Sequence, residues 1–338
     1  MKTLFDKTNI GTMTLKNRFI RAAIGEKTLN GYVNQHILNT YKDLALGGVG
    51  TMITGFTLAD ETEKSYHMMA FYDDSFAKGH KKLTDLVHAL DANIILQLVH
   101  VGSNVKGDPA DVTVLAPSAV KNLNTKIVPK KITLKEIKNI QNKFAEAALR
   151  AKNAGYDGVE IHAAHGFFLS QFMTPYYNRR NDLYGGSAPN RARMILETYE
   201  KIRKSVGNDY PVWIKINVTD GIEDGVSFDD VLYLCKELSN KKIDAIEISG
   251  NWQNCKKQSA YFQNEAEKIA AETETAVILT GGNNNFEEMT EILNTTKINY
   301  FGMARALVKD PGLISKFVKE KHSKKQTNSK NKNNRIIE

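Results

Sequence analysis

Cysteine is nearly absent from this sequence: Cys235 and Cys255 are the two among 338 residues. Two cysteines exclude a disulfide framework, and they are too few for a cysteine-ligated zinc or iron–sulfur site. Long apolar runs are also missing, as is the charged-then-apolar order of a signal peptide near the N-terminus. We therefore expect a protein of the reducing cytoplasm, with no membrane-spanning segment and no metal site.

Basic charge is in excess, but most of the excess lies at one end of the chain. The formal net charge is +8 at pH 7, and residues 319–335 hold seven Lys or Arg against one acid, which leaves +2 for the rest. Apolar residues are scarce there, so we expect residues 321–338 to form a basic, disordered tail rather than a specific nucleic-acid site. We expect residues 1–320 to form one large folded domain.

Short β-rich runs alternate with helical patterns along that domain. An N-terminal hairpin is predicted over residues 3–17, and residues 166–188 read as a long loop without helical period. The remaining alternation predicts an α/β fold whose parallel strands close into a (β/α)8 TIM barrel, with the hairpin as a cap. The predicted strands are residues 18–24, 50–54, 94–98, 157–161, 212–217, 245–249, 277–280 and 300–303; the predicted helices are residues 35–46, 74–90, 133–153, 191–206, 229–238, 265–272, 286–293 and a segment after Pro311.

Residues of chemical interest follow these strands, at the end where a barrel places its active site. After the last two strands, TGGN at 280–283 and GMAR at 302–305 offer backbone N–H groups and a guanidinium that suit a phosphate. Glu26 and Lys27 have no assigned role, and a solvated turn is the simplest interpretation. The strand-end residues are Gly25, Glu26, Thr57, Gln97, His100, His162, His165, Lys215, Asn217, Asn251, Trp252, Gly281, Gly282 and Arg305.

Seven motifs stand out: LKNR at 15–18, QLVHVG at 97–102, APS at 116–118, EIHAAHG at 160–166, NRRND at 178–182, YGGS at 184–187 and GMARALVKDP at 302–311. Together they resemble the Old Yellow Enzyme family of FMN-dependent oxidoreductases, over residues 4–318. The resemblance implies a barrel that carries FMN and is reduced by NADH or NADPH. The length and the lack of cysteine clusters are typical of the single-domain type of this family.

The resemblance also implies a place for each cofactor-binding residue. The backbone of Ala22, Ala23 and Gly25 would lie along one edge of the flavin. Gln97 would hydrogen-bond the pyrimidine end of the ring. Lys215, where the family usually has Arg, would place positive charge near flavin N1 but lacks the planar fork of a guanidinium. The phosphate would be held by Gly281, Gly282, Ala304 and Arg305.

His162 and His165 match the pair that binds a carbonyl oxygen of the substrate over the flavin. Two N–H donors polarise an α,β-unsaturated carbonyl and favour hydride transfer from flavin N5 to its β-carbon. The family generally carries a proton-donating tyrosine two residues after the second of these groups, and this chain has Phe167 there. The possible replacements as proton donor are Tyr66, Tyr176, Tyr177 and water.

The predicted function is hydride transfer from NADH or NADPH through FMN to a small electron-poor alkene of the α,β-unsaturated carbonyl type. Nicotinamide and substrate would use one site, because no Gly-x-Gly-x-x-Gly follows a strand. Two alternatives stay open: a barrel lyase or aldolase with Lys215 as a Schiff-base nucleophile, and a flavin-binding protein with weak or no ene-reductase activity because of Phe167. A homodimer or homotetramer is typical of the resembled family, with no specific nucleic acid or membrane as a partner.

Overall fold

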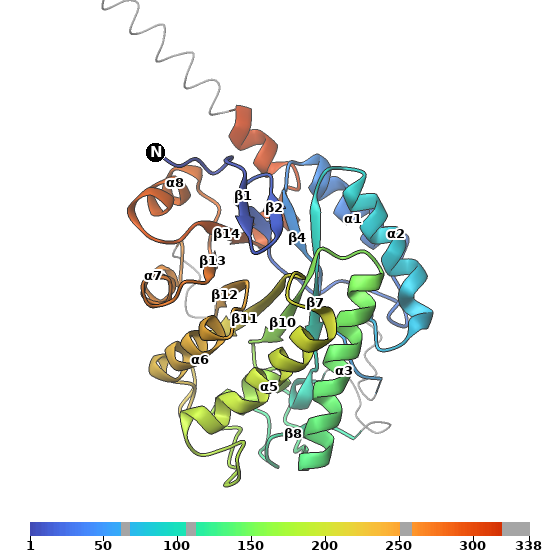
Figure 1. Cartoon of the computed structure of the whole chain (residues 1–338), viewed down its shortest axis with the longest axis vertical. Coiled ribbons are helices and arrows are strands. Elements are labelled where there is room, and N and C mark those ends of the chain that lie inside the picture. The colour runs from blue at the N-terminus through green and yellow to red at the C-terminus, as the bar shows by residue number, and fades with distance from the viewer. Residues whose placement is uncertain (62–67, 106–112, 251–258, 320–338) are drawn as a thin grey trace, which may run out of the picture.

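A closed ring of parallel strands forms the centre of the molecule (Figure 1), in a computed structural model that describes residues 1–61, 68–105, 113–250 and 259–319. Each strand of the ring pairs in parallel with the next, and the pairing of β14 with β3 closes it. This ring confirms the predicted barrel. Its strands in order are β3 (Phe19–Arg21), β4 (Thr51–Ile53), β7 (Asn93–Val99), β10 (Gly158–Ala163), β11 (Val212–Asn217), β12 (Ala245–Ser249), β13 (Ala276–Thr280) and β14 (Tyr300–Met303).

The N-terminal hairpin is present and covers the amino-terminal end of the strands. β1 (Thr8–Ile10) pairs antiparallel with β2 (Met13–Leu15) through a turn at Gly11, whose φ of +57° suits glycine. Buried side chains of both arms pack in one apolar cluster with Ile95 and Trp213 of the barrel. The hairpin therefore closes the end of the barrel opposite the predicted active site.

Helices follow the strands around the ring, as the alternation predicted. The longest, α3 (Leu134–Asn153), begins at a capping box in which Thr133 and Glu136 satisfy each other's backbone N–H groups. Residues 313–319, after Pro311, are also helical. The other helices are α1 (Gln35–Leu46), α2 (Ala77–His88), α4 (Phe168–Met173), α5 (Ala188–Val206), α6 (Phe228–Asn240), α7 (Gln263–Glu272), α8 (Phe286–Thr295) and α9 (Arg305–Lys309).

Two of the described α-helices were not predicted, α4 and α9, and α4 lies inside the segment that the sequence indicates as a loop. All six of its residues are buried, so the segment has no polar face, and without a polar face it shows no amphipathic period. Short pieces also flank the ring: η1 (Asp74–Phe76), η2 (Gly102–Asn104), β5 (Thr57–Leu58), β6 (Met69–Ala70), β8 (Leu115–Ala116) and β9 (Lys130–Lys131).

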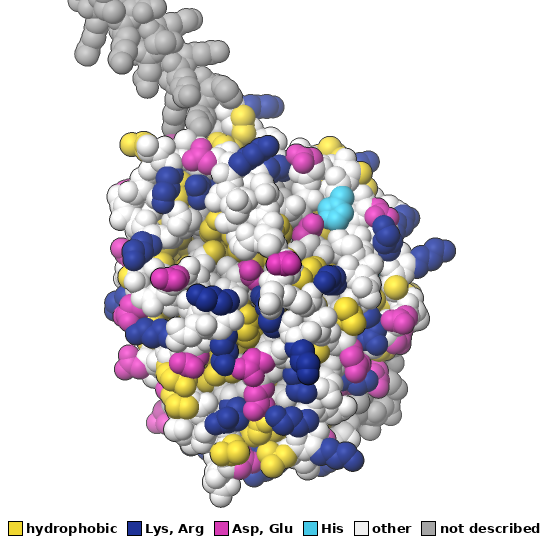
Figure 2. Space-filling model, in the orientation of Figure 1, with side chains coloured by type: hydrophobic (Ala, Val, Ile, Leu, Met, Phe, Trp, Pro, Cys, Tyr) yellow, Lys and Arg dark blue, Asp and Glu magenta, His cyan; other side chains and the backbone are white. Residues whose placement is uncertain are grey.

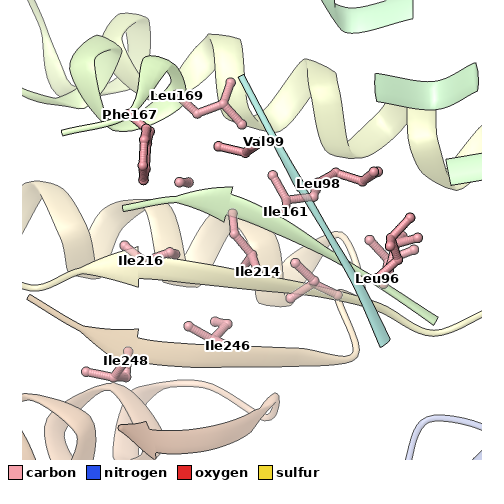
Figure 3. Close-up of a cluster of buried hydrophobic side chains, with 14 of the residues drawn as sticks. Leu96, Leu98, Val99, Ile161, Phe167, Leu169, Ile214, Ile216, Ile246 and Ile248 are labelled. Carbon is pink, nitrogen blue, oxygen red and sulfur yellow. The ribbon is translucent and has the colours of Figure 1, made fainter. Parts of the chain in front are cut away.

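Side chains alternate along the barrel strands between the helix-facing core and the inside of the ring. Ile214 and Ile216 of β11 and Ile246 of β12 belong to the large core cluster (Figure 3). Successive residues of a strand point to opposite faces, so Lys215 and Glu247 point into the ring. Polar side chains are thereby collected inside the barrel.

The outer surface carries charges of both signs. Figure 2 shows Lys and Arg interspersed with Asp and Glu across one face of the molecule. The predicted tail, residues 321–338, lies outside the described residues.

Candidate active site

The two histidines of the fourth barrel strand lie side by side at its carboxyl end. His162 is in β10, and His165 is in the turn that follows, with a φ of +59°. The centroids of the two rings are 5.2 Å apart and the planes nearly perpendicular. The backbone N–H of His165 donates to Asn217 Oδ1 at 3.1 Å, and its Nε2 lies 2.8 Å from Ser249 Oγ. The turn expected directly after His162 is therefore present, and neighbouring strands hold it.

Both histidines are held as neutral rings. His162 Nδ1 accepts a hydrogen bond from the Ala164 backbone N–H at 3.3 Å, so the neutral ring carries its proton on Nε2. Burial lowers the pKa of His162 well below its ordinary value, and His165 and Lys215 add to the effect. Burial of the imidazole and the charge of Lys215 also lower the pKa of His165, although the residue as a whole is exposed on the side of the cavity mouth. Near neutral pH the pair offers N–H donors without positive charge.

Lys215 lies below the histidines, in an ion pair inside the ring. Its Nζ is 3.0 Å from Glu247 Oε1, and the two side chains are 3% and 0% exposed. Thr280 donates to the same oxygen at 2.6 Å. Gln97, on β7 and separated from Lys215 by one strand, donates through Nε2 to Glu160 Oε2 at 2.6 Å. Gln97 and Lys215, the two side chains predicted to bind the flavin ring, therefore each contact a carboxyl group.

Those carboxyl groups were missed from the sequence. Glu247 was not noticed, and Glu160 was taken as part of a buried strand and of the motif EIHAAHG, without a role of its own. The signal was a single acidic residue in each of two otherwise apolar strands, GVEIHA of β10 and AIEIS of β12. A buried acid in such a place is expected to have a partner.

The glycines after β13 and β14 line a cavity of about 540 Å³ together with Arg305. Gly281 and Gly282 have φ values of +133° and +80°, and a Cβ on Gly281 would lie 3.1 Å from the Tyr261 ring, so this backbone requires glycine. Asn283 donates to the backbone oxygens of Leu279 and Gly302 and joins the two loops. The lining includes the predicted phosphate residues Gly281, Gly282, Ala304 and Arg305, and adds Lys309.

The end of β3 supplies a small-residue edge to the mouth. The Ala22 N–H donates to the Met303 oxygen at 3.0 Å, which ties this edge to β14. Ala23 follows, and Gly25 has no room for a side chain, because a Cβ there would lie 2.9 Å from the Phe56 ring. The flavin-edge residues predicted at this point therefore adjoin the phosphate cavity across the β14–β3 pairing.

Glu26, by contrast, was interpreted wrongly as part of a solvated turn. Its Oε1 lies 3.0 Å from the guanidinium of Arg21 in a pair whose side chains are 9% and 4% exposed. Tyr41 donates to the same oxygen at 2.5 Å, and Arg21 donates to the Ile53 backbone oxygen at 2.6 Å. The residue is a buried structural anion, and only Lys27 is exposed as expected. No local pattern indicated that Arg21, inside a strand, needed a counter-charge.

A second cavity, of about 370 Å³, opens beside the histidine pair. It is lined by His165, Tyr177, Asn217 and Asp220 among others. Phe167 is 8% exposed, and its ring packs against His162, with centroids 4.8 Å apart. Phe167, at the position where the family generally carries its proton donor, is therefore not among the residues that line this cavity. Tyr177, from elsewhere in the chain, does line it.

The remaining predicted residues have structural contacts or lie outside the described part of the chain. His100 stacks on Phe168 with centroids 4.3 Å apart, and its Nδ1 accepts from the Gly102 N–H. Thr57 is buried in β5. Asn251, Trp252 and Tyr66 are not among the described residues.

Within the described ranges, three or more His, Cys, Asp or Glu are nowhere grouped to hold a metal, and none of the helices has the length and apolarity to span a membrane.

Comparison with known proteins gives consistent results. The chain is 33% identical over 331 residues to a metal reductase of Desulforamulus reducens, which covers 94% of this chain and 48% of the relative. It is 30% identical over 319 residues to an NADPH dehydrogenase of Bacillus velezensis, which covers 92% of both chains. The chain therefore spans about half the length of the first relative and nearly all of the second.

Structural comparison supports the same fold. An Old Yellow Enzyme homologue from Zymomonas mobilis superposes with a TM-score of 0.83 at 22% identity, over 94% of this chain and 93% of the other. The family model described as NADH:flavin oxidoreductase / NADH oxidase matches residues 3–324. The chain belongs to this FMN-linked family, the family of Old Yellow Enzyme.

Proposed function

We propose that this protein is an FMN-dependent NAD(P)H oxidoreductase that reduces a small electron-poor alkene. The observation that carries the proposal is the neutral pair His162 and His165 at the same barrel mouth as Lys215 and the glycine cradle. FMN, when bound, would receive a hydride from NADH or NADPH and deliver it from N5 to the acceptor. The family membership and the name of the NADPH dehydrogenase relative support this.

The side chains at the mouth fit FMN. Gln97 Oε1 is buried and has no hydrogen-bond partner in the part of the chain that the structure describes, so it is available to accept the imide N–H of a flavin. Lys215 supplies positive charge for the pyrimidine end. The cavity after β13 and β14 supplies backbone N–H groups and a guanidinium for the phosphate. The residues assigned to FMN are Ala22, Ala23, Gly25, Gln97, Lys215, Gly281, Gly282, Ala304 and Arg305.

His162 and His165 are assigned to the substrate. As neutral rings they donate hydrogen bonds to a carbonyl oxygen without demanding a negative charge on it. As that oxygen gains electron density during hydride transfer, two fixed donors stabilise it more than they stabilise the ground state. A ketone or aldehyde conjugated to the alkene is therefore the expected acceptor.

Proton delivery to the α-carbon is assigned to Tyr177. Its hydroxyl accepts the Leu123 backbone N–H at 3.3 Å, so its own proton is free to be donated. Burial raises the pKa of Tyr177, which keeps that proton in place. Tyr177 lines the cavity that His165 also lines. Tyr176 packs on Arg179, and the described residues contain no other tyrosine of the three candidates.

The lyase alternative gains no support from the geometry. A Schiff-base nucleophile must be free to attack a carbonyl carbon, whereas the Nζ of Lys215 is held 3.0 Å from the buried Glu247 carboxyl group. The flavin-binding alternative rests on Phe167 alone and is addressed by the experiment below.

Visible absorbance of the purified protein with FMN tests the proposal. Under anaerobic conditions NADPH or NADH should bleach the flavin band, and cyclohexenone should restore it. Bleaching without recovery would favour a different acceptor. A bound flavin that neither nicotinamide bleaches would favour the flavin-binding protein. Failure to bind FMN, combined with borohydride trapping of a carbonyl compound on Lys215, would overturn the proposal in favour of the lyase.

Three further features of the protein remain predictions: a cytoplasmic location, a homodimer or homotetramer, and a basic tail over residues 321–338. Size-exclusion chromatography with light scattering measures the second directly. Binding of nucleic acid by the full chain, but not by a chain ending at residue 320, would contradict the expectation that the tail is a solubilising segment.

A further inference from the structure

Polar side chains from consecutive strands meet inside the barrel, below the histidine pair. Gln97 and Glu160 are register partners on β7 and β10, and Lys215 and Glu247 are register partners on β11 and β12. The exposed fractions of these four residues are 0%, 0%, 2% and 0%. Thr280 of β13 completes the group. Buried charge of this density is costly unless each group has a partner.

The polar atoms of this cluster are only partly satisfied: besides Gln97 Oε1, two carboxyl oxygens lack a partner among the described residues. Glu160 Oε2 accepts from Gln97, and Glu247 Oε1 accepts from Thr280 and pairs with Lys215. Their other oxygens, Glu160 Oε1 and Glu247 Oε2, are buried without a donor among the described residues. Two carboxyl groups so placed satisfy each other only if one is protonated and donates to the other.

The surroundings decide which carboxyl keeps the proton. Burial and the charge of Glu247 raise the pKa of Glu160 well above its ordinary value. Burial opposes ionisation of Glu247 as well, but the charge of Lys215, together with the hydrogen bonds from Thr280 and Lys215, outweighs it and leaves its pKa lowered. The asymmetry follows from position, because Lys215 contacts Glu247 and only the neutral amide of Gln97 contacts Glu160.

We propose that Glu160 is a neutral acid and Glu247 a carboxylate, and that this acid–carboxylate pair positions Lys215 and Gln97 and sets the charge presented to the pyrimidine end of the flavin. This deepens the proposed function and depends on it for the flavin. Glu247 offsets the Lys215 charge. Glu160 orients the Gln97 amide. It engages the amide nitrogen, so the carbonyl oxygen is the atom that can face the flavin ring. Both glutamates act through another residue and do not contact the substrate.

The matched pair Glu160→Gln and Glu247→Gln tests the assignment, because glutamine resembles a protonated glutamate and not an ionised one. The holoprotein is titrated with sulfite, which adds to flavin N5 and leaves negative charge at N1. Glu160→Gln should leave the sulfite dissociation constant within about twofold of wild type. Glu247→Gln should lower the sulfite dissociation constant about tenfold or more, since Lys215 then faces the flavin ring without its counter-charge. Flavin midpoint potentials should move in the same order.

Thermal unfolding without FMN provides a readout that does not depend on the proposed function. Glu160→Gln should unfold near the wild-type midpoint, and Glu247→Gln should unfold at a lower temperature because a buried ammonium is left unpaired. Adding Lys215→Met to Glu247→Gln should restore much of the loss, and it keeps the test valid if the single variant does not fold. Equal effects of the two glutamine variants, or a larger effect at Glu160, would overturn the assignment. Failure of wild type to bind FMN would overturn the proposed function alone.

Discussion

At the scale of single residues, the aromatic ring of Phe167 would separate hydride transfer from proton transfer in the proposed reaction. It packs on His162 and on Phe56, with centroids 4.8 and 5.4 Å apart. A phenyl ring there covers one side of His162 but has no proton to donate. In the proposed reaction the proton would come from Tyr177, which lines the cavity beside His165.

Tyr177→Phe should slow flavin reoxidation by an enone about a hundredfold and leave reduction by NADPH unchanged. The proton is needed only when the alkene accepts the hydride, so stopped-flow absorbance of each half-reaction separates the two effects. Tyr176→Phe is the matched control, because the Tyr176 ring lies over Arg179 at 6.0 Å. Equal reoxidation rates in both variants would assign the proton to water. Phe167→Tyr should speed reoxidation if a hydroxyl at that position reaches the α-carbon.

A second residue-scale prediction concerns the buried pair of Arg21 and Glu26. Glu26→Ala should reduce the free energy of unfolding by about 3 to 5 kcal/mol, because the buried guanidinium is left without its counter-charge. Asp85→Ala is the control: it breaks an ion pair with Lys81 whose side chains are 58% and 57% exposed, and it should cost less than about 1 kcal/mol. Urea denaturation measures both. Similar losses would mean that Tyr41 and the Ile53 oxygen already compensate Arg21.

At the scale of elements, short sequence signals determine where a helix begins and ends, and packing determines which of its faces is buried. α3 starts where Thr133 and Glu136 form the capping box that the sequence indicates. α4 has no comparable signal, since its N-cap position is Phe167 and no side chain caps it. It forms because all its residues are buried against the barrel and α5, a context that a local window does not contain.

Thr133→Ala should therefore lower the free energy of unfolding by about 1 kcal/mol, the usual effect of removing an N-cap hydroxyl. The backbone N–H of Glu136 loses its acceptor at the start of α3. Thr40→Ala is a suitable control, because the Thr40 hydroxyl bonds the His36 oxygen within α1 and caps nothing. A loss in the control as large as in Thr133→Ala would refute a role for the cap.

At the scale of the whole molecule, buried neutral histidines make the fold sensitive to acid. His80 is fully buried between Tyr156, whose hydroxyl lies 2.7 Å from Nδ1, and the Ala70 oxygen, 3.0 Å from Nε2. Burial lowers the pKa of His80 to about 4, against a partial opposing effect of the Ala70 oxygen. The unfolded state binds the proton first, so stability is lost as the pH falls from about 6.5 towards 4.

His80 alone should reduce the free energy of unfolding by about 3 kcal/mol between pH 7 and pH 4, and buried His162 adds to the loss in the same direction. His80→Gln should flatten this dependence even if it lowers stability at pH 7. His36→Gln, at an exposed position, should leave the slope as it is. Urea unfolding at several pH values measures the slope, and an unchanged slope in His80→Gln would contradict the account.

Much of the architecture was predictable because its signals are local. The bounds of β11, β12, β14 and α1 match the sequence-based ranges, since buried strands appear as short apolar runs and α1 as an amphipathic period. The turn after His162 also followed from its sequence. The wrong interpretation of Glu26 and the unnoticed Glu247 share a cause, because no local pattern shows their partners. Glu26 contacts Arg21 of β3 and Tyr41 of α1, and Glu247 contacts Lys215 of β11.

The sequence by itself determined the order of strands and helices, the barrel that eight such repeats form, and the family to which its motifs belong. Only the tertiary structure decided the electrostatics of the mouth. Lys215 meets Glu247, and Tyr177 shares a cavity with His165, because barrel closure brings separate strands and loops together. The free energy of a buried charge depends on neighbours within a few ångströms, and those neighbours exist only once the ring has closed.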